Sequence, residues 1–244
     1  MQIYTTIKIG DFHTNHCEDY LITAEAGKHK LLCAVMDGCS MGNDSYFAAT
    51  LTGKILRKIA KGLSYKEFIS KQSEDLPLLL ENVTSQLFHE LRSFKSSIQL
   101  EWDEILNTVL ISVIDTANCA GEFLCIGDGL ICINGALYEF EQNNRPDYLG
   151  YHLDKDFKTW YVSQKQRISA QEIKDFSIAT DGIFTFKKFD NKVYRESDDV
   201  IEWLLLNTEG HQSTGMLDRK LLEIESDWGL RPTDDLAVIR GIIE

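Results

Sequence analysis

The stretch Leu31-Leu32-Cys33-Ala34-Val35-Met36-Asp37-Gly38-Cys39-Ser40-Met41-Gly42-Asn43-Asp44 is the part of the sequence from which the fold is best predicted. Its apolar first half predicts a central, buried strand over 30–36. The run stops at Asp37-Gly38, and Asp44 is a good N-cap for a following helix. A carboxylate beside a glycine at the end of a buried strand is a common setting for a metal ligand, although Asp-Gly is also a common turn.

The composition is that of a soluble globular protein with one large core. The 244 residues are 43% hydrophobic and 10% aromatic, and no stretch approaches the length of a membrane span. The net charge of −13 argues against nucleic acid or an anionic membrane as the main partner. The six cysteines form no CxxC pair and predict reduced thiols. The first residues lack a signal-peptide layout, so a cytoplasmic location is expected.

Hydrophobic patterning predicts the order of the elements. The predicted strands are 2–9, 20–23, 30–36, 107–114, 122–126, 130–134, 137–140, 159–163, 175–180 and 236–243. The predicted helices are one that follows Asp44 and ends at Gly62, one that starts near Ser73, and two short ones over 200–206 and 216–224, capped by Ser197 and Thr214.

Strands that follow one another without long crossovers favour antiparallel sheets covered by helices. No linker or repeat divides the chain, and we predict one α+β domain over residues 1–244. The polar segment 141–158 is expected to be a surface flap.

Acidic residues recur where predicted strands begin or end. They are Glu18-Asp19, Asp37, Asp128, Asp181 and Asp234-Asp235. Any one of them is more simply explained as a turn residue. Five repetitions favour a shared site instead, because carboxylates that converge in a cleft repel one another unless a cation neutralises them. Oxygen ligands without a His/Cys set favour Mg²⁺ or Mn²⁺ over zinc.

The order of these motifs resembles the metal-dependent Ser/Thr protein phosphatases of the protein phosphatase 2C type. The matching motifs are Glu18-Asp19, Ala34-Val35-Met36-Asp37-Gly38, Gly127-Asp128, Ala179-Thr180-Asp181-Gly182 and Thr233-Asp234-Asp235-Leu236. The resemblance spans nearly the whole chain. It implies a four-layer α-β-β-α sandwich, in which two antiparallel sheets pack face to face and helix pairs cover both outer faces.

The resemblance also implies a centre of two Mn²⁺ or Mg²⁺ ions. Asp37 would bridge the ions, the carbonyl of Gly38 would bind one, and Asp181 and Asp234 would complete the direct ligands. Glu18 and Asp19 would act mainly through bound waters. Asp128 matches the position associated with a weaker third ion.

Three positions depart from the family's pattern. Thr14 stands where the family has a phosphate-binding arginine, and Cys39 stands where many members have a histidine that acts as general acid. Thr185 replaces an acidic residue associated with the third metal. His13 or His16 could supply the missing donor, so we group them with Asp37 and Asp181 as candidate catalytic residues.

The predicted function is hydrolysis of phosphoserine or phosphothreonine on phosphorylated protein substrates. Two alternatives remain open. Thr14 and Cys39 would also suit a pseudophosphatase that acts as a binding or regulatory module, and the same site could hydrolyse small phosphoesters. The sequence predicts no oligomeric state.

Overall fold

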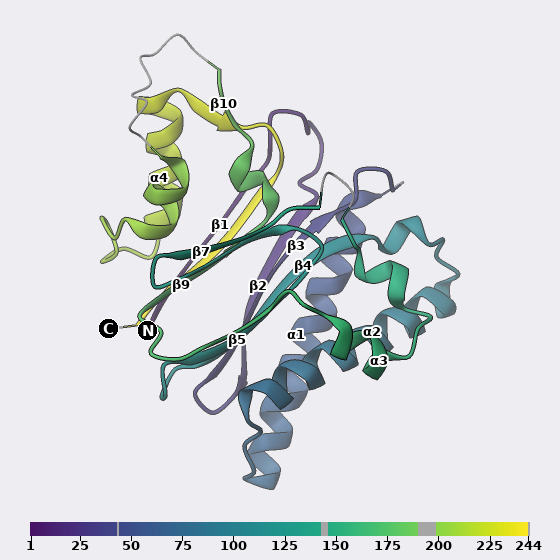
Figure 1. The fold of residues 1–244 in the computed structure, drawn as a ribbon. Helices are drawn as coiled ribbons and strands as arrows, with labels where there is room; N and C mark the ends of the chain where they lie inside the picture. The colour runs from purple at the N-terminus through teal and green to yellow at the C-terminus, as the bar shows by residue number, and fades with distance from the viewer. Residues whose placement is uncertain (43, 143–145, 190–198, 244) are drawn as a thin grey trace.

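The structure is a computed structural model that describes all residues except 43, 143–145, 190–198 and 244. Two five-stranded antiparallel sheets pack face to face. α1 and α2 lie on one side of them and α4 lies on the other (Figure 1). The structure therefore confirms the predicted α+β class and the four-layer α-β-β-α arrangement.

The first sheet contains the strand predicted from Leu31–Met36. Its strands, in spatial order, are β2 (Asp19–Gly27), β3 (Lys30–Gly38), β4 (Asn107–Asp115), β5 (Ala120–Ile126) and β8 (Arg167–Ala170). Leu32, Ala34 and Met36 pack on the helix side of β3. Cys33 and Val35 face the other sheet. Both faces of β3 are covered, which explains why its sequence is apolar throughout.

The second sheet joins the two ends of the chain. Its strands, in spatial order, are β1 (Gln2–Lys8), β12 (Leu236–Ile242), β9 (Asp175–Ala179), β6 (Gly129–Ile133) and β7 (Ala136–Phe140). β1 pairs with β12 from Gln2↔Ile242 to Lys8↔Leu236. A separate small hairpin pairs β10 (Phe186–Lys188) with β11 (Leu230–Pro232). The chain crosses between the two sheets at Gly127-Asp128, from β5 to β6.

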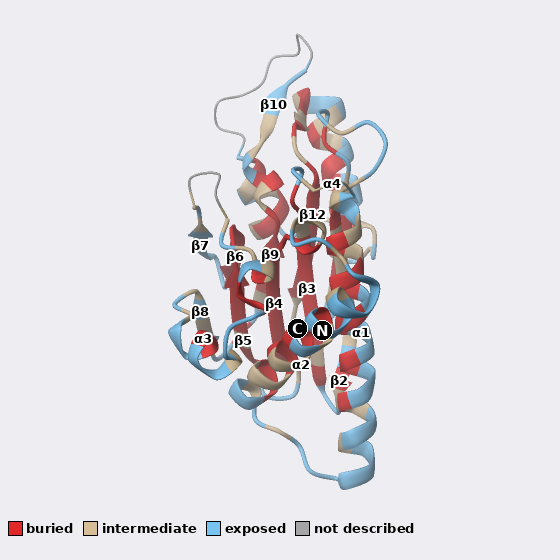
Figure 2. Cartoon of the chain, turned by 90° about the vertical axis from the view of Figure 1, so that its right-hand side faces the viewer, coloured by how far each residue is buried: buried red, intermediate tan, exposed pale blue. Residues whose placement is uncertain are grey.

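Two long helices cover the first sheet, α1 (Ser45–Ser70) and α2 (Leu76–Ile98). Their buried faces join the core on that side, and their outer faces are exposed (Figure 2). α1 begins after Asp44, as predicted, although the Asp44 side chain makes no capping hydrogen bond. Among the described residues, no helix has the length and apolar character that crossing a membrane requires.

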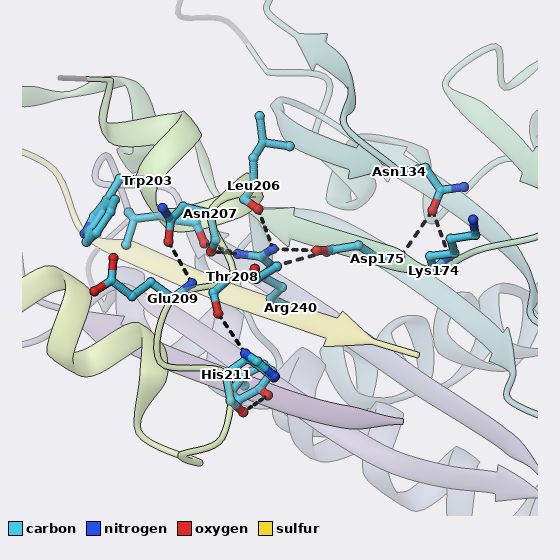
Figure 3. Close-up of polar contacts among 12 residues, drawn as sticks. Asn134, Lys174, Asp175, Trp203, Leu206, Asn207, Thr208, Glu209, His211 and Arg240 are labelled. Atoms are coloured by element: carbon cyan, nitrogen blue, oxygen red, sulfur yellow. Dashed lines mark hydrogen bonds and ion pairs between the residues drawn. The ribbon is translucent and has the colours of Figure 1, made fainter. Parts of the chain in front are cut away.

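The second sheet is covered by α4 (Met216–Glu223) and the helical segments Glu202–Leu206 and Ile224–Trp228. Arg240 of β12 is fully buried under this layer. Its guanidinium donates to the Asp175 carboxylate and to the carbonyls of Leu204, Leu206 and Asn207 (Figure 3). One buried cation thus joins two strands of the sheet to the C-terminal end of the segment Glu202–Leu206.

Four sequence predictions about elements are wrong. α1 runs through Gly62, where an added side chain would meet open space, so no packing forces the helix to end there. α2 starts at Leu76, because Asp75 and not Ser73 caps it by accepting from the Leu78 amide.

The other two errors concern short elements. The predicted strand 159–163 lies in α3 (Phe157–Ser163), whose first turn is capped by Asp156. α4 begins after Gly215 without a side-chain cap, so Thr214 does not cap it. The predicted cap Ser197 lies outside the described residues.

Candidate metal centre

The predicted carboxylates gather at one end of the sandwich. Asp19 and Asp37 are register partners on β2 and β3. Asp181 follows β9, and Asp234 precedes β12, with which β9 pairs. Asp128 lies in the crossover between the sheets. The strand ends of both sheets thus bring together acidic residues that are far apart in the sequence.

Burial and the charges of their neighbours raise the pKa values of these carboxylates. Burial raises the pKa of Asp37 well above its usual value, and the charges of Asp19, Asp181 and Asp234 raise it further. Burial is also the main cause of the raised pKa of Asp19, reinforced by Asp235 and Asp181. Burial with Asp128 and Asp234 raises the pKa of Asp181 to about 7. These shifts are typical of a desolvated carboxylate cluster without a counter-ion.

The donor set fits a hard divalent cation. Asp19 and Asp128 each have one buried carboxylate oxygen, Oδ1, with no hydrogen-bond partner among the described residues. Such oxygens are costly to bury unless they gain a ligand. As the side chains of the described residues lie, no three His, Cys, Asp or Glu form a group ready to hold an ion. The chemistry therefore fits Mg²⁺ or Mn²⁺, and the carboxylates must reorient to bind it.

Gly38 and Glu18 are held against the start of α1. The Gly38 amide donates to the Glu18 carbonyl at 3.2 Å. A Cβ at position 38 would lie 2.1 Å from the Ser45 carbonyl oxygen, so only glycine fits this approach. The Glu18 carboxylate accepts from the hydroxyls of Ser40, at 2.8 Å, and Ser45. These contacts place Glu18 next to the Asp37-Gly38 strand end, with its carboxylate held by two hydroxyls.

Asp235 is a residue of the centre to which sequence reasoning gave no role. Its side chain is fully buried and accepts from the backbone amides of Gly10, at 2.7 Å, and Glu18, at 2.5 Å. The Asp234 side chain, by contrast, is 44% exposed. The two neighbours, which lie between β11 and β12, therefore differ in burial and in role. Asp235 holds the loop before β2 in place and leaves Asp234 facing the centre.

The two candidate histidines differ in position. His13 Nδ1 lies 2.9 Å from Asp235 Oδ2, and its ring is 3.9 Å from both Glu18 and Asp234. Burial lowers the pKa of His13, but the three carboxylates outweigh burial and raise it overall above 6.5. His16 is exposed and packs against Tyr46, with ring centroids 4.5 Å apart. The structure therefore brings His13, and not His16, to the carboxylates.

The three departures from the family's pattern have visible structural settings. Thr14 is exposed and supplies no cation. The buried Cys39 thiol lies within hydrogen-bond reach of the hydroxyl of Tyr148, in the predicted flap. Thr185 Oγ1 accepts from the Asp234 amide at 3.1 Å and donates to the Gly182 carbonyl at 2.9 Å. Thr185 thus links the loops of Asp181 and Asp234.

The metal-free protein is expected to lose stability as the pH rises. Burial and neighbouring carboxylates raise the pKa of Asp128 to about 6 and that of Asp181 to about 7, against 3.8 for a free carboxyl. Between the pKa of a free carboxyl and these raised values, the folded chain still binds protons that the unfolded chain has released. The free energy of unfolding therefore falls as the pH increases. In EDTA, Tm should be lower at pH 7.5 than at pH 5.5, and added Mn²⁺ should raise Tm more at pH 7.5. Asp181→Asn should make Tm in EDTA depend less on pH. A Tm gain from Mn²⁺ that is the same at both pH values would contradict the role of the raised carboxyl pKa values.

A sequence model of the protein phosphatase 2C family matches residues 12–222. This match spans most of the chain and includes the carboxylate motifs from Glu18 to Asp181. The chain belongs to the protein phosphatase 2C family. A search of curated proteins gave no match.

Solved structures share the fold at low sequence identity. A bacterial serine phosphatase aligns over 100% of this chain and 98% of its own, at 12% identity and a TM-score of 0.64. RsbX in complex with magnesium aligns over 100% and 96%, at 18% identity and a TM-score of 0.57. The phosphatase domain of SpoIIE from Bacillus subtilis, with a fragment of its regulatory domain, aligns over 100% and 63%, at 18% identity and a TM-score of 0.55.

Proposed function

We propose that this protein hydrolyses phosphoserine or phosphothreonine on proteins, with two Mn²⁺ or Mg²⁺ ions as cofactors. The observation that carries the proposal is the cluster of partly buried carboxylates, Asp37, Asp181 and Asp234, which occur in the order of the family's motifs, and in which Asp181 and Asp234 raise the pKa of Asp37. A cluster of this kind needs cations to hold its charges together. Family membership supplies the reaction class.

In this proposal the residues have separate tasks. Asp37, Asp181, Asp234 and the Gly38 carbonyl would hold the two ions. Glu18 and Asp19 would act mainly through bound waters, and Asp128 would contribute to a third, weaker site. When bound, the ions supply the positive charge that activates water for in-line attack and offsets the phosphoryl charge.

The chain's own hydrogen bonds prepare this arrangement. Thr180 Oγ1 donates to Asp19 Oδ2 at 2.6 Å and accepts from the Ala237 amide at 2.9 Å, which fixes one Asp19 oxygen. Asp235 Oδ2 lies 2.9 Å from His13 Nδ1, so the carboxylate attracts the protonated ring. The Nε2 edge of His13 lies 3.9 Å from Glu18 Oε2, beyond hydrogen-bond distance, so it can donate a proton to a phosphoryl or leaving-group oxygen. No serine or cysteine nucleophile is required.

Replacing His13 is expected to slow turnover, whereas replacing His16 is not. His13→Gln should lower kcat about 10²-fold at saturating Mn²⁺, which is the usual contribution of a positioned proton donor. His16→Gln should change kcat less than about twofold, because the ring is exposed and packs on Tyr46. Steady-state kinetics on one phosphoserine peptide measures both. Equal losses in the two variants would contradict the assignment.

The substrate class is tested by comparing phosphoserine and phosphothreonine peptides with p-nitrophenyl phosphate under the same Mn²⁺ concentration. We expect a higher kcat/KM on the peptides. A preference for the small ester would favour the small-phosphoester alternative. Binding of a phosphopeptide without turnover at any Mn²⁺ concentration would favour the pseudophosphatase alternative, for which exposed Thr14 and buried Cys39 are the supporting observations.

A further inference from the structure

The crossover that carries Asp128 is an unusual piece of backbone. Gly127 has φ of +96°, and a Cβ there would lie 2.7 Å from Thr108 Cγ2. This turn is the link between the two sheets, because β5 belongs to the first sheet and β6 to the second. Asp128 is 7% exposed, and its Oδ1 has no hydrogen-bond partner among the described residues. No hydrogen bond from the described residues holds Oδ1, so the turn that carries Asp128 largely sets where this oxygen lies.

The side chain of Gln166 hydrogen-bonds to the backbone of this turn. Gln166 lies just before β8, where its carbonyl accepts from the Cys125 amide at 2.9 Å. Its side-chain Nε2 donates to the Gly127 carbonyl at 2.9 Å and to the Cys125 carbonyl at 3.2 Å. A single carboxamide thus holds the end of β5 and the first residue of the turn. A donor at this point stabilises a backbone conformation that glycine alone would leave mobile.

Gln166 is itself held by the predicted flap. Its Oε1 accepts from Gln142 Nε2 at 3.1 Å, and Gln142 Oε1 accepts from the Asp147 amide at 2.5 Å. Asp147 Oδ1 lies 2.7 Å from His152 Nε2, and His152 Nδ1 lies 2.8 Å from Lys155 Nζ. These hydrogen-bonded residues line one pocket of about 640 Å³, together with Gly127. The hydrogen bonds run without a break from the flap surface to the Gly127 carbonyl.

We infer that Gln166 is a positioning residue for Asp128, and that it couples the flap to the third-metal side of the centre. The inference rests on the proposed function only in taking Asp128 as a metal ligand. Groups that hold a metal ligand in place typically change metal affinity about 10–100-fold when removed, without touching the ion. Among the described residues, the Gln166 side chain hydrogen-bonds to the Cys125 and Gly127 carbonyls and to Gln142, so we expect its effect on Asp128 to pass through the turn.

The test is a calorimetric titration of Mn²⁺ into metal-free protein, with Tm recorded for each variant. Gln166→Ala should weaken the weakest Mn²⁺ binding step about tenfold and leave the tighter steps unchanged. Gln166→Glu keeps the shape but replaces the donor with an oxygen, and it should be at least as severe. Gln164→Ala is the matched control, because its Nε2 donates to the Trp160 carbonyl, at 3.2 Å, and not to the turn. It should leave the isotherm unchanged.

A double variant separates positioning from general packing. If Gln166 acts through Asp128, Asp128→Asn with Gln166→Ala should bind Mn²⁺ no more weakly than Asp128→Asn alone. Three results would overturn the inference. They are a double variant whose loss of Mn²⁺ affinity is the product of the two single losses, an unchanged isotherm in Gln166→Ala, and an equal loss of affinity at every Mn²⁺ site accompanied by a fall in Tm. Wild-type protein that binds Mn²⁺ but hydrolyses no phosphoester would overturn the proposed function and leave the inference standing. Wild-type protein that binds no Mn²⁺ would overturn both.

Discussion

Asp37→Asn is expected to abolish hydrolysis while making the metal-free protein more stable. Asp37 is the proposed bridge between the ions, and an amide cannot supply the charge of a bridging carboxylate. The loss of kcat/KM should exceed about 10³-fold, because the metal charge contributes several kcal/mol to transition-state stabilisation. In the metal-free protein, however, Asp37 is buried beside Asp19, Asp181 and Asp234, and its charge is unfavourable. Its removal relieves that repulsion.

The two effects of Asp37→Asn have opposite signs, which makes the prediction specific. Tm in EDTA at pH 8 should rise by about 2–4 °C, corresponding to about 1 kcal/mol for a chain of this size. Mn²⁺ should then add less to Tm than it adds to the wild type. Asp44→Asn is the control, because Asp44 is exposed and makes no capping hydrogen bond. Loss of activity together with a fall in Tm in EDTA would mean that Asp37 has a structural role instead.

Arg240→Met is expected to cause a severe loss of stability. It would leave the Asp175 carboxylate and the carbonyls of Leu204 and Leu206 without the guanidinium donor, while the Asn207 carbonyl keeps its hydrogen bond from Lys220 (Figure 3). Breaking one side of a buried ion pair costs about 3–5 kcal/mol. Urea unfolding measures the loss.

A second arginine offers a matched comparison. Arg231 pairs with Glu225, but both side chains are partly exposed, at 37% and 22%. Arg231→Met should cost less than about 1 kcal/mol, as exposed pairs do. The double variant Arg240→Met with Asp175→Leu should lose less free energy of unfolding than the two single variants lose together, because neither charge then remains buried alone. A loss below about 1 kcal/mol in Arg240→Met would contradict the role of Arg240 in the layer.

The sequence predicted the elements whose signals are local and repeated. The apolar run Leu31–Met36 predicted a central strand covered on both faces, and each acidic motif lies where an apolar strand begins or ends. Short elements were less predictable. Residues 159–163 have the composition of a strand but lie in α3, where the Asp156 cap decides the conformation. In so short a segment, periodicity cannot separate a strand from a helical turn.

The roles within the site depended on contacts that no pattern encodes. Asp234 and Asp235 are chemically identical neighbours, and only the hydrogen bonds from the Gly10 and Glu18 amides show that Asp235 is the buried one. The sequence does not distinguish His13 from His16 as candidates, whereas in the structure His16 packs on Tyr46. Gln166 had no sequence signal, because the carbonyls it binds lie about forty residues earlier in the chain.

The central claim is that the carboxylates at the strand ends form a metal centre for phosphoester hydrolysis. The most direct measurement is phosphate release from a phosphoserine peptide by EDTA-treated protein as Mn²⁺ is added. We expect no release without the metal, a saturable increase with Mn²⁺, and reversal by excess EDTA. Release that does not depend on Mn²⁺, or none at any Mn²⁺ or Mg²⁺ concentration, would contradict the claim.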